Sequence, residues 1–325
     1  MSRSVWTGLL LSAVSPFIYA QGNGGGGRIF EPGQPEVLIH STVGNAVAAR
    51  ANAGRPHGGS NNLSYHGGTG GVGVETAPKV YLVLWGAHWN NNDPSGEVAL
   101  LTSFYNNVGG SGWLNSVTQY CQGVPNGTIF CNGAGTAAGN PASLLAGVWY
   151  DNATSAPSRP SQTQLAAEAA RAANYFANTT AASNASVQYV IATATGNNAS
   201  GFGTQYCAWH SATSSSYGNI AYTNLPYITD AGASCGANFN GLGPNAGITI
   251  VGGHEMAETI TDQFPSSGWL DSGGAENGDK CAWITSGNQG ASANITTANN
   301  STFAVQSLWS NASNNGAGGC ALSFP

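Results

Sequence analysis

Residues 251–262 read Val-Gly-Gly-His-Glu-Met-Ala-Glu-Thr-Ile-Thr-Asp, and the rest of the chain is organised around this stretch. Six of the fourteen Asp and Glu residues of the chain fall between Glu255 and Asp279. No Lys or Arg lies between Arg171 and Lys280 to neutralise them. Crowded carboxylates raise one another's pKa unless protons or a cation intervene. The stretch therefore predicts a bound cation.

The spacing within the stretch indicates how the cation is held. Residues four apart share one face of a helix, so His254 and Glu258 can ligate the same ion while Glu255 points at a bound water. This HExxE box differs by one ligand from the HExxH of zinc hydrolases. Such a string also occurs in ordinary helices, and the downstream carboxylates are what favour a metal here. Oxygen ligands alone suit calcium, whereas a histidine among them favours zinc or another transition metal.

Composition and charge narrow the class of protein. The 325 residues are enough for one large domain with a sizeable core. Only 7% of the residues are charged, and Gly, Asn, Ser, Thr and Ala dominate, which is typical of secreted proteins. The formal net charge is −6 without basic clusters. This balance argues against nucleic acid or an anionic membrane as a partner.

The N-terminus predicts export. Arg3 precedes an apolar run around residues 8–14, and Ala20 is a small residue of the kind that signal peptidase prefers. We therefore expect residues 1–20 to be a signal peptide, and no later segment reaches the ~20 apolar residues of a membrane-spanning helix. Residues 21–77 are Gly-rich and lack sustained periodicity, which predicts a disordered lead-in or a pro-segment. The remaining residues, 78–325, are expected to form a single domain of a secreted, extracellular protein.

Cysteine usage agrees with an oxidising compartment. All six cysteines lie after residue 20, and their spacing is not that of a zinc ribbon. Of the fifteen pairings, we favour the bonds between sequence neighbours: Cys121–Cys131, Cys207–Cys235 and Cys281–Cys320. Sequons at Asn62, Asn126, Asn152 and Asn178 predict a glycoprotein if the host is eukaryotic, or are accidents of an Asn-rich composition.

The hydrophobic pattern predicts alternating strands and helices. Buried strands are expected at 79–85, 145–150 and 187–193, and a closing strand at 303–309. Helices are expected at 95–108 and 164–177, as well as in the HExxE box, where the helix begins at Gly252-Gly253 or extends back through Ile248. The order of elements predicts an α+β fold, in which a mixed β-sheet is packed with helices and stapled by disulfides.

An aromatic, Gly-rich segment at residues 203–239 is expected to form a wall of the site. A bond between Cys207 and Cys235 would hold His210 and Tyr222 on a hairpin or loop of fixed shape. His210 is the best second histidine of the chain, either as a metal ligand or as a hydrogen-bond donor to a transition state.

Taken together, these motifs resemble the secreted EXORDIUM or phosphate-induced protein family of plants and its microbial relatives. The likeness covers roughly residues 78–325 and rests on five segments, 80–85, 206–210 with 224–227 and Cys235, 253–258, 276–281, and 305–309. The resemblance implies an extracellular protein with a shared site. In plants the family is linked to growth and cell-wall responses.

Our first hypothesis is a zincin-like metallohydrolase, namely a peptidase acting on extracellular protein or peptide substrates. His254 and Glu258 would bind Zn²⁺ together with Glu276, for which Asp279 is the substitute. Zinc lowers the pKa of its bound water towards ~7, and Glu255 would take the proton. His210 or Tyr222 would steady the oxyanion.

Two alternatives remain open from the sequence. The first is a non-catalytic extracellular protein that holds Ca²⁺ or another structural ion and binds cell-wall glycan or a protein partner. Its sugar-stacking residues would be Trp209, Tyr217, Tyr222 and Tyr227. The weaker alternative is a glycosidase that uses two carboxylates such as Glu255 and Glu276.

Overall fold

The computed structural model describes residues 18–21, 26–30, 34–52 and 61–325. Most of the expected signal peptide, residues 1–17, lies outside these ranges. Its last residues belong to the edge strand β1 (Ile18–Gln21). Within the described ranges, no helix combines the length and apolar character that crossing a bilayer requires.

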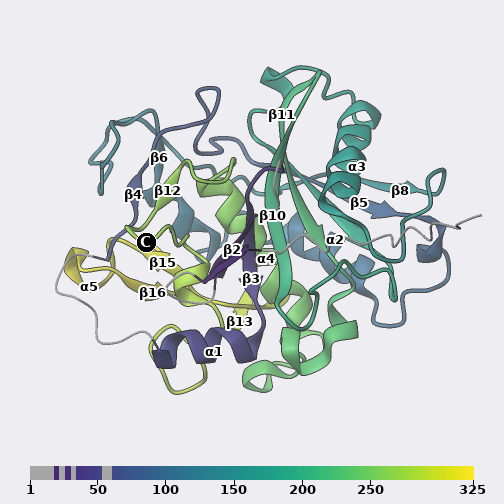
Figure 1. Ribbon diagram of the computed structural model, residues 1–325. Coiled ribbons are helices and arrows are strands. Elements are labelled where there is room, and N and C mark those ends of the chain that lie inside the picture. Colours follow the sequence, from purple (N-terminus) through teal and green to yellow (C-terminus); the bar gives the residue numbers. More distant parts are fainter. Residues whose placement is uncertain (1–17, 22–25, 31–33, 53–60) are drawn as a thin grey trace, which may run out of the picture.

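A mixed sheet forms the centre of the molecule (Figure 1). Four neighbouring strands, β11, β9, β5 and β8, run parallel. Helices α2 (Glu97–Asn107) and α3 (Gln162–Tyr175) connect β5, β8 and β9, whereas β9 leads to β11 through β10. On the other side of β11 the sheet continues through antiparallel pairs. In spatial order the strands are β1, β2 (Gly26–Phe30), β3 (Val37–Ser41), β10 (Tyr206–Ser215), β11 (Gly218–Leu225), β9 (Val187–Thr193), β5 (Lys79–Trp85) and β8 (Leu145–Asp151).

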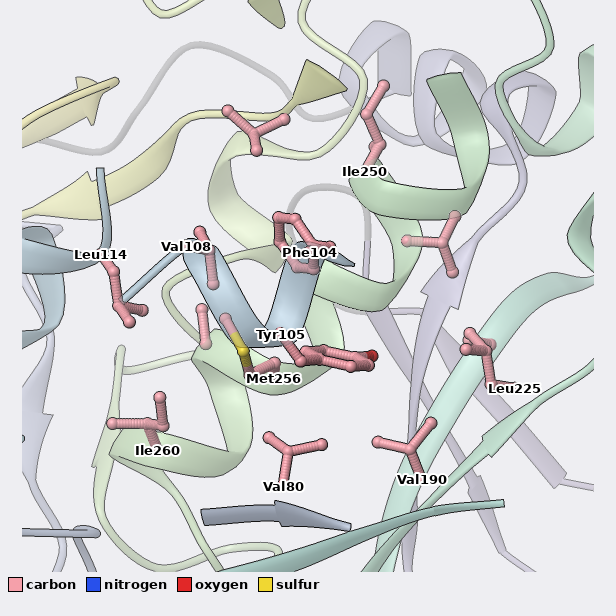
Figure 2. Packing of buried hydrophobic residues seen from close by; sticks show 14 of the residues in the cluster. Val80, Phe104, Tyr105, Val108, Leu114, Val190, Leu225, Ile250, Met256 and Ile260 are labelled. Carbon is pink, nitrogen blue, oxygen red and sulfur yellow. The ribbon is translucent and has the colours of Figure 1, made fainter. Parts of the chain in front are cut away.

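Helices cover both faces of this sheet. The alternation of buried residues along the strands divides the core into two clusters, one against α3 (Gln162–Tyr175) and the other against α2 (Glu97–Asn107) and α4 (Ala246–Thr261). Figure 2 shows the second cluster, in which side chains of α2 and α4 meet Val80, Val190 and Leu225 of the strands. The expected mixed sheet packed with helices is confirmed as a mixed α/β architecture.

Helix α4 is buried along its whole length, although it contains two adjacent glycines. A Cβ at Gly252 would lie 3.0 Å from the Tyr105 hydroxyl, and one at Gly253 would lie 3.0 Å from the Phe104 ring. The glycines therefore admit the side chains of α2, and the helix extends back through Ile248 to Ala246. The close neighbour of the two glycines is helix α2.

The Gly-rich lead-in is not disordered where the structure describes it. Strands β2 and β3 join the central sheet, and α1 (Val43–Asn52) and β4 (Ser64–Tyr65) follow them. The physical reason is that Val37 to His40 form an apolar run that buries side chains on both faces of the sheet. The run is short, and the glycines around it led the sequence analysis to predict disorder for the whole segment.

The three expected cysteine pairs are confirmed, since Cys121–Cys131, Cys207–Cys235 and Cys281–Cys320 each lie within disulfide distance.

The C-terminal part consists of short strands and one short helix. In place of the expected closing strand there are two strands, at Thr302–Val305 and Leu308–Ser310, separated by Gln306 and Ser307. The remaining elements are β6 (Cys121–Gln122) with β7 (Thr136–Ala137), β12 (Trp269–Leu270) with β4, β13 (Ala293–Thr296) with β14 (Thr302–Val305), β15 (Leu308–Ser310) with β16 (Gly319–Ala321), and α5 (Ser313–Gly316).

Candidate metal site

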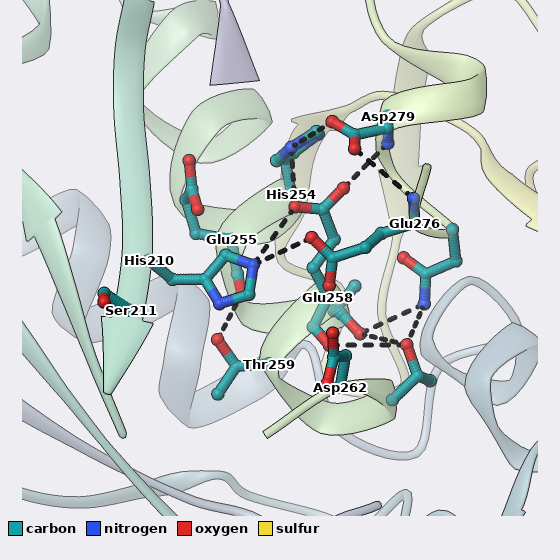
Figure 3. A network of polar contacts seen from close by, with 12 residues as sticks. His210, Ser211, His254, Glu255, Glu258, Thr259, Asp262, Glu276 and Asp279 are labelled. Atoms are coloured by element: carbon teal, nitrogen blue, oxygen red, sulfur yellow. Dashed lines mark hydrogen bonds and ion pairs between the residues drawn. The ribbon is translucent and has the colours of Figure 1, made fainter. Parts of the chain in front are cut away.

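The HExxE box is helical, and it brings His254 and Glu258 together on one face of α4. The Nε2 atom of His254 lies 2.9 Å from Glu258 Oε2. Both side chains are fully buried and point towards the loop that carries Glu276 and Asp279 (Figure 3). The i,i+4 geometry that the sequence predicted is therefore present.

Asp279 completes this group of ligand atoms. Its Oδ1 lies 3.8 Å from His254 Nε2, and its backbone N–H donates to Glu258 Oε1 at 2.7 Å. Gly278 makes the close approach feasible, because a Cβ there would come within 2.7 Å of His254 Nδ1 and 2.9 Å of Glu258 Oε1. His254, Glu258 and Asp279 form a buried triad able to hold an ion.

Glu276, the first choice for a third ligand, takes a different position. Its Oε2 lies 3.0 Å from Nε2 of His210, and it belongs to none of the ligand-distance groups among the described residues. His210, from β10, also approaches Glu258 Oε2, at 3.6 Å. The expected second histidine is thus at the site, and Glu276 orients it.

Glu255 lies beside the triad. Its carboxylate is within ligand distance of His210 and Glu258, and also of His254, in overlapping groups of buried side chains. Neither carboxylate oxygen has a hydrogen-bond partner among the described residues. A buried carboxylate in this state requires a proton, a water or a cation.

His40 is a residue of the site that sequence reasoning missed. It lies on β3, and its ring stacks on that of His254 with centroids 3.7 Å apart and planes 7° from parallel. Trp283 stacks on it as well, at 4.8 Å. The available signal was the period-two pattern of the strand, which places Leu38 and His40 on one face.

Tyr222, in contrast, is not brought to the site. In the β10–β11 pair it stands opposite Ser211, whereas His210 stands opposite Thr223. Cross-strand partners share a face and neighbours along a strand do not, so Tyr222 points away from His210. Its ring packs edge-on against Trp209 in the core under α3, 5.8 Å between centroids. Of the two residues expected to steady an oxyanion, His210 is at the cluster and Tyr222 is not.

The aromatic residues expected to stack on sugars are mostly internal. Trp209, Tyr222 and Tyr227 are buried in the core, and only Tyr217, at the β10–β11 turn, is partly exposed. Residues 203–239 are therefore rich in aromatic side chains because several of them pack in the core.

The electrostatics of the cluster favour a cation. Burial raises the pKa of Glu258 well above its ordinary value, and Asp279, Glu276 and Glu255 raise it further. Burial likewise raises the pKa of Asp279 and of Glu255, with Glu276 the next cause in both. The nearby Lys280 ammonium is already engaged, at 2.7 Å from Asp271 and 4.2 Å above the Trp309 ring.

The protonation of His254 is set by Gln306. The side-chain amide of Gln306 donates through Nε2 to the carbonyl oxygen of Gly278 at 2.8 Å, so its Oε1 is an acceptor. That oxygen lies 3.2 Å from His254 Nδ1, which must carry the proton. Burial lowers the pKa of His254 well below its ordinary value, so the ring is neutral. Its Nε2 lone pair therefore faces the carboxylate oxygens of Glu258 and Asp279.

The distances in the triad fit a small divalent ion. Two atoms that each lie about 2.0–2.1 Å from a tetrahedral zinc are roughly 3.3 Å apart. The separations from His254 Nε2 to Glu258 and to Asp279, 2.9 and 3.8 Å, bracket that value. The buried His, Glu and Asp groups could thus hold a metal ion, and the donor atoms alone leave its identity open between zinc and harder cations.

In comparisons with known proteins, the chain matches no family model, no curated protein and no solved structure. The resemblance to the EXORDIUM family stays a prediction from the sequence motifs.

Proposed function

We propose that the protein is a secreted metal-dependent hydrolase, a zincin-like peptidase in which His254, Glu258 and Asp279 hold a zinc ion. The observation that carries the proposal is the neutral imidazole of His254, whose Nε2 lone pair is directed at two carboxylates. Three acceptor groups facing one another in a buried space repel unless protons or a cation lie between them, and the proposal takes the cation. The three cysteine pairs are compatible with an extracellular protein.

The residues around the triad supply the remaining roles. When bound, the metal would polarise a substrate carbonyl and acidify a water molecule. Glu255, which has no hydrogen-bond partner among the described residues, takes the proton from that water. His210, oriented by Glu276 at 3.0 Å, is placed to donate to the developing oxyanion.

The test separates metal binding from chemistry. Protein purified without chelator is assayed for bound metal by elemental analysis and for hydrolysis of casein and peptide libraries. We expect stoichiometric zinc, and we expect Glu255→Gln to keep the metal while losing at least about 100-fold in kcat. Glu168→Gln, which changes a buried carboxyl on α3, is the matched control and should leave both unchanged. Loss of metal from Glu255→Gln would contradict the assignment of Glu255 as the base.

A structural cation is the second candidate, and the complete burial of the cluster favours it. His254, Glu258 and Glu276 are no more than 1% exposed, and Asp279 is 5% exposed. Under this alternative the ion, calcium for example, holds α4 to the loop at residues 271–281. Stoichiometric calcium with no hydrolysis of any substrate would establish it in place of the peptidase.

A further inference from the structure

Strand β3 occupies the edge of β10 directly beside the cluster. The two strands pair antiparallel, with Leu38 opposite His210 and His40 opposite Ala208. Cross-strand partners share a face, so Leu38 and His40 lie on the same side of the sheet as His210. The backbone of β3 therefore runs past the ligand atoms, with every second side chain turned towards them.

The N-terminal segment also covers the cluster. Gly26 of β2 lies directly against the Asp279 carboxylate, and a side chain there would collide with it. His40 lies flat on His254, and neither of its ring nitrogens has a hydrogen-bond partner among the described residues. The segment thus contacts two of the three triad residues, and the triad is at most 5% exposed.

We propose that the substrate is an extended polypeptide that pairs antiparallel with β10 in the place of β3, and that strands β2 and β3 are an intramolecular occupant that keeps the site closed. The inference rests on the proposed peptidase function. An exposed strand edge binds extended peptides through main-chain hydrogen bonds, largely independent of sequence. The side chains at the Leu38 and His40 positions of such a peptide would face the cluster, on the same side of the sheet as His210.

Buried apolar side chains of β3 hold the segment in the sheet, and four polar contacts add to this attachment. Arg28 donates to Glu36 at 2.7 Å and to Ser266 Oγ at 3.1 Å, and its second nitrogen donates to the carbonyl oxygen of Gly274 at 2.9 Å. Ser211 of β10 donates to the carbonyl oxygen of Glu36 at 2.6 Å. These contacts can be removed without altering any residue of the cluster.

The experiment uses the zinc-loaded full-length chain carrying Arg28→Ala and Ser211→Ala together. Hydrogen exchange should show faster exchange of the β3 amides than in the wild type, and hydrolysis of casein should rise about tenfold, since three hydrogen bonds of Arg28 and one of Ser211 are lost. The synthetic peptide of residues 34–43, Gln-Pro-Glu-Val-Leu-Ile-His-Ser-Thr-Val, added in trans, should reverse the increase. A peptide of the same residues in scrambled order should not.

The controls separate this inference from the proposed function. Lys79→Ala removes an exposed cation from the start of β5 and should change neither exchange nor hydrolysis. Binding of a fluorescent 34–43 peptide to the double variant is measured by anisotropy, which needs no catalysis. Peptide binding without hydrolysis of any substrate would overturn the peptidase and leave the strand site standing. The strand site would be overturned if the β3 amides exchange faster in an active enzyme while its rate of hydrolysis stays unchanged. It would also be overturned if the double variant does not bind the peptide. If β3 stays closed in the double variant, Trp283→Phe is added, which removes the 2.7 Å bond from Nε1 to the carbonyl oxygen of Ser41.

Discussion

At the cluster, one amide side chain decides which nitrogen of His254 carries the proton. Gln306 is held by the Gly278 carbonyl and presents its own oxygen to Nδ1. Such a second contact fixes both the tautomer and the orientation of a ligating ring. Under the proposed function, Gln306 would act on a bound ion through His254, as a positioning residue.

Replacement of this amide tests the assignment. We expect Gln306→Leu to weaken zinc binding about 10- to 100-fold, because His254 loses the acceptor that holds its proton on Nδ1. Affinity is measured by competition with a chromophoric chelator. Gln263→Leu, at another buried glutamine, whose amide donates to the carbonyl oxygens of Asn184 and Val187, should bind zinc as the wild type does. Equal zinc affinities in both variants would contradict the role of Gln306.

Residue by residue, the sequence predicted the members of the site that local spacing determines. His254, Glu255 and Glu258 lie on one helix, so their relation follows from helical geometry alone. Whether Glu276 or Asp279 joins His254 depends on the turn at Gly278, and which loop conformation forms there is decided by packing. His40 and Gln306 are far away in sequence, and nothing in their local pattern indicates a partner on α4.

At the scale of elements, α4 is a helix against local preference. A glycine in a helix interior costs up to about 1 kcal/mol relative to alanine, and α4 has adjacent glycines at Gly252 and Gly253. The contact of these glycines with Tyr105 and Phe104 of α2 offsets that cost by close packing of the two helices. The position of α4, and with it that of His254, depends on this contact.

The helix contact can be tested by adding volume. We expect Gly253→Val to lower the free energy of unfolding by about 1–3 kcal/mol, because its side chain would meet Phe104 and Trp113. Gly44→Ala in α1 is the matched control, since a Cβ there meets no atom within 4 Å, and it should raise stability by about 0.5–1 kcal/mol. Denaturant titration measures both. A valine at 253 without cost would show that α2 and α4 are less closely packed than described.

At the scale of the whole molecule, bound metal is expected to stabilise the fold and to make stability depend on pH. The pKa values of Glu258 and Asp279 are raised above their ordinary 4.5 and 3.8, so the metal-free fold favours their protonated forms. The contribution of these two carboxyls to the stability of the metal-free protein is therefore fully present below about pH 4 and is lost as pH rises through the raised pKa values. Metal must displace these protons, so its affinity rises over the same range.

The expected outcome is a difference between chelated and zinc-loaded protein that grows with pH. At zinc concentrations about 100 times the Kd, binding adds roughly 2.7 kcal/mol to the free energy of unfolding. Thermal and denaturant unfolding from pH 5 to 8, with and without chelator, measures the effect. The oxidised disulfides are kept intact in both samples. Equal stability with and without chelator at pH 8 would contradict a cation in the cluster.

The sequence by itself determined the elements whose signals are local. These are strand β5, helix α3, the HExxE helix with its crowded carboxylates, and the three cysteine pairs between sequence neighbours. Only the tertiary structure decided that β3 lies on β10, that His40 covers His254, and that Tyr222 faces away. The physical reason is that strand pairing joins residues more than 160 positions apart, and a shift of register by one residue reverses the face on which every side chain of a strand lies.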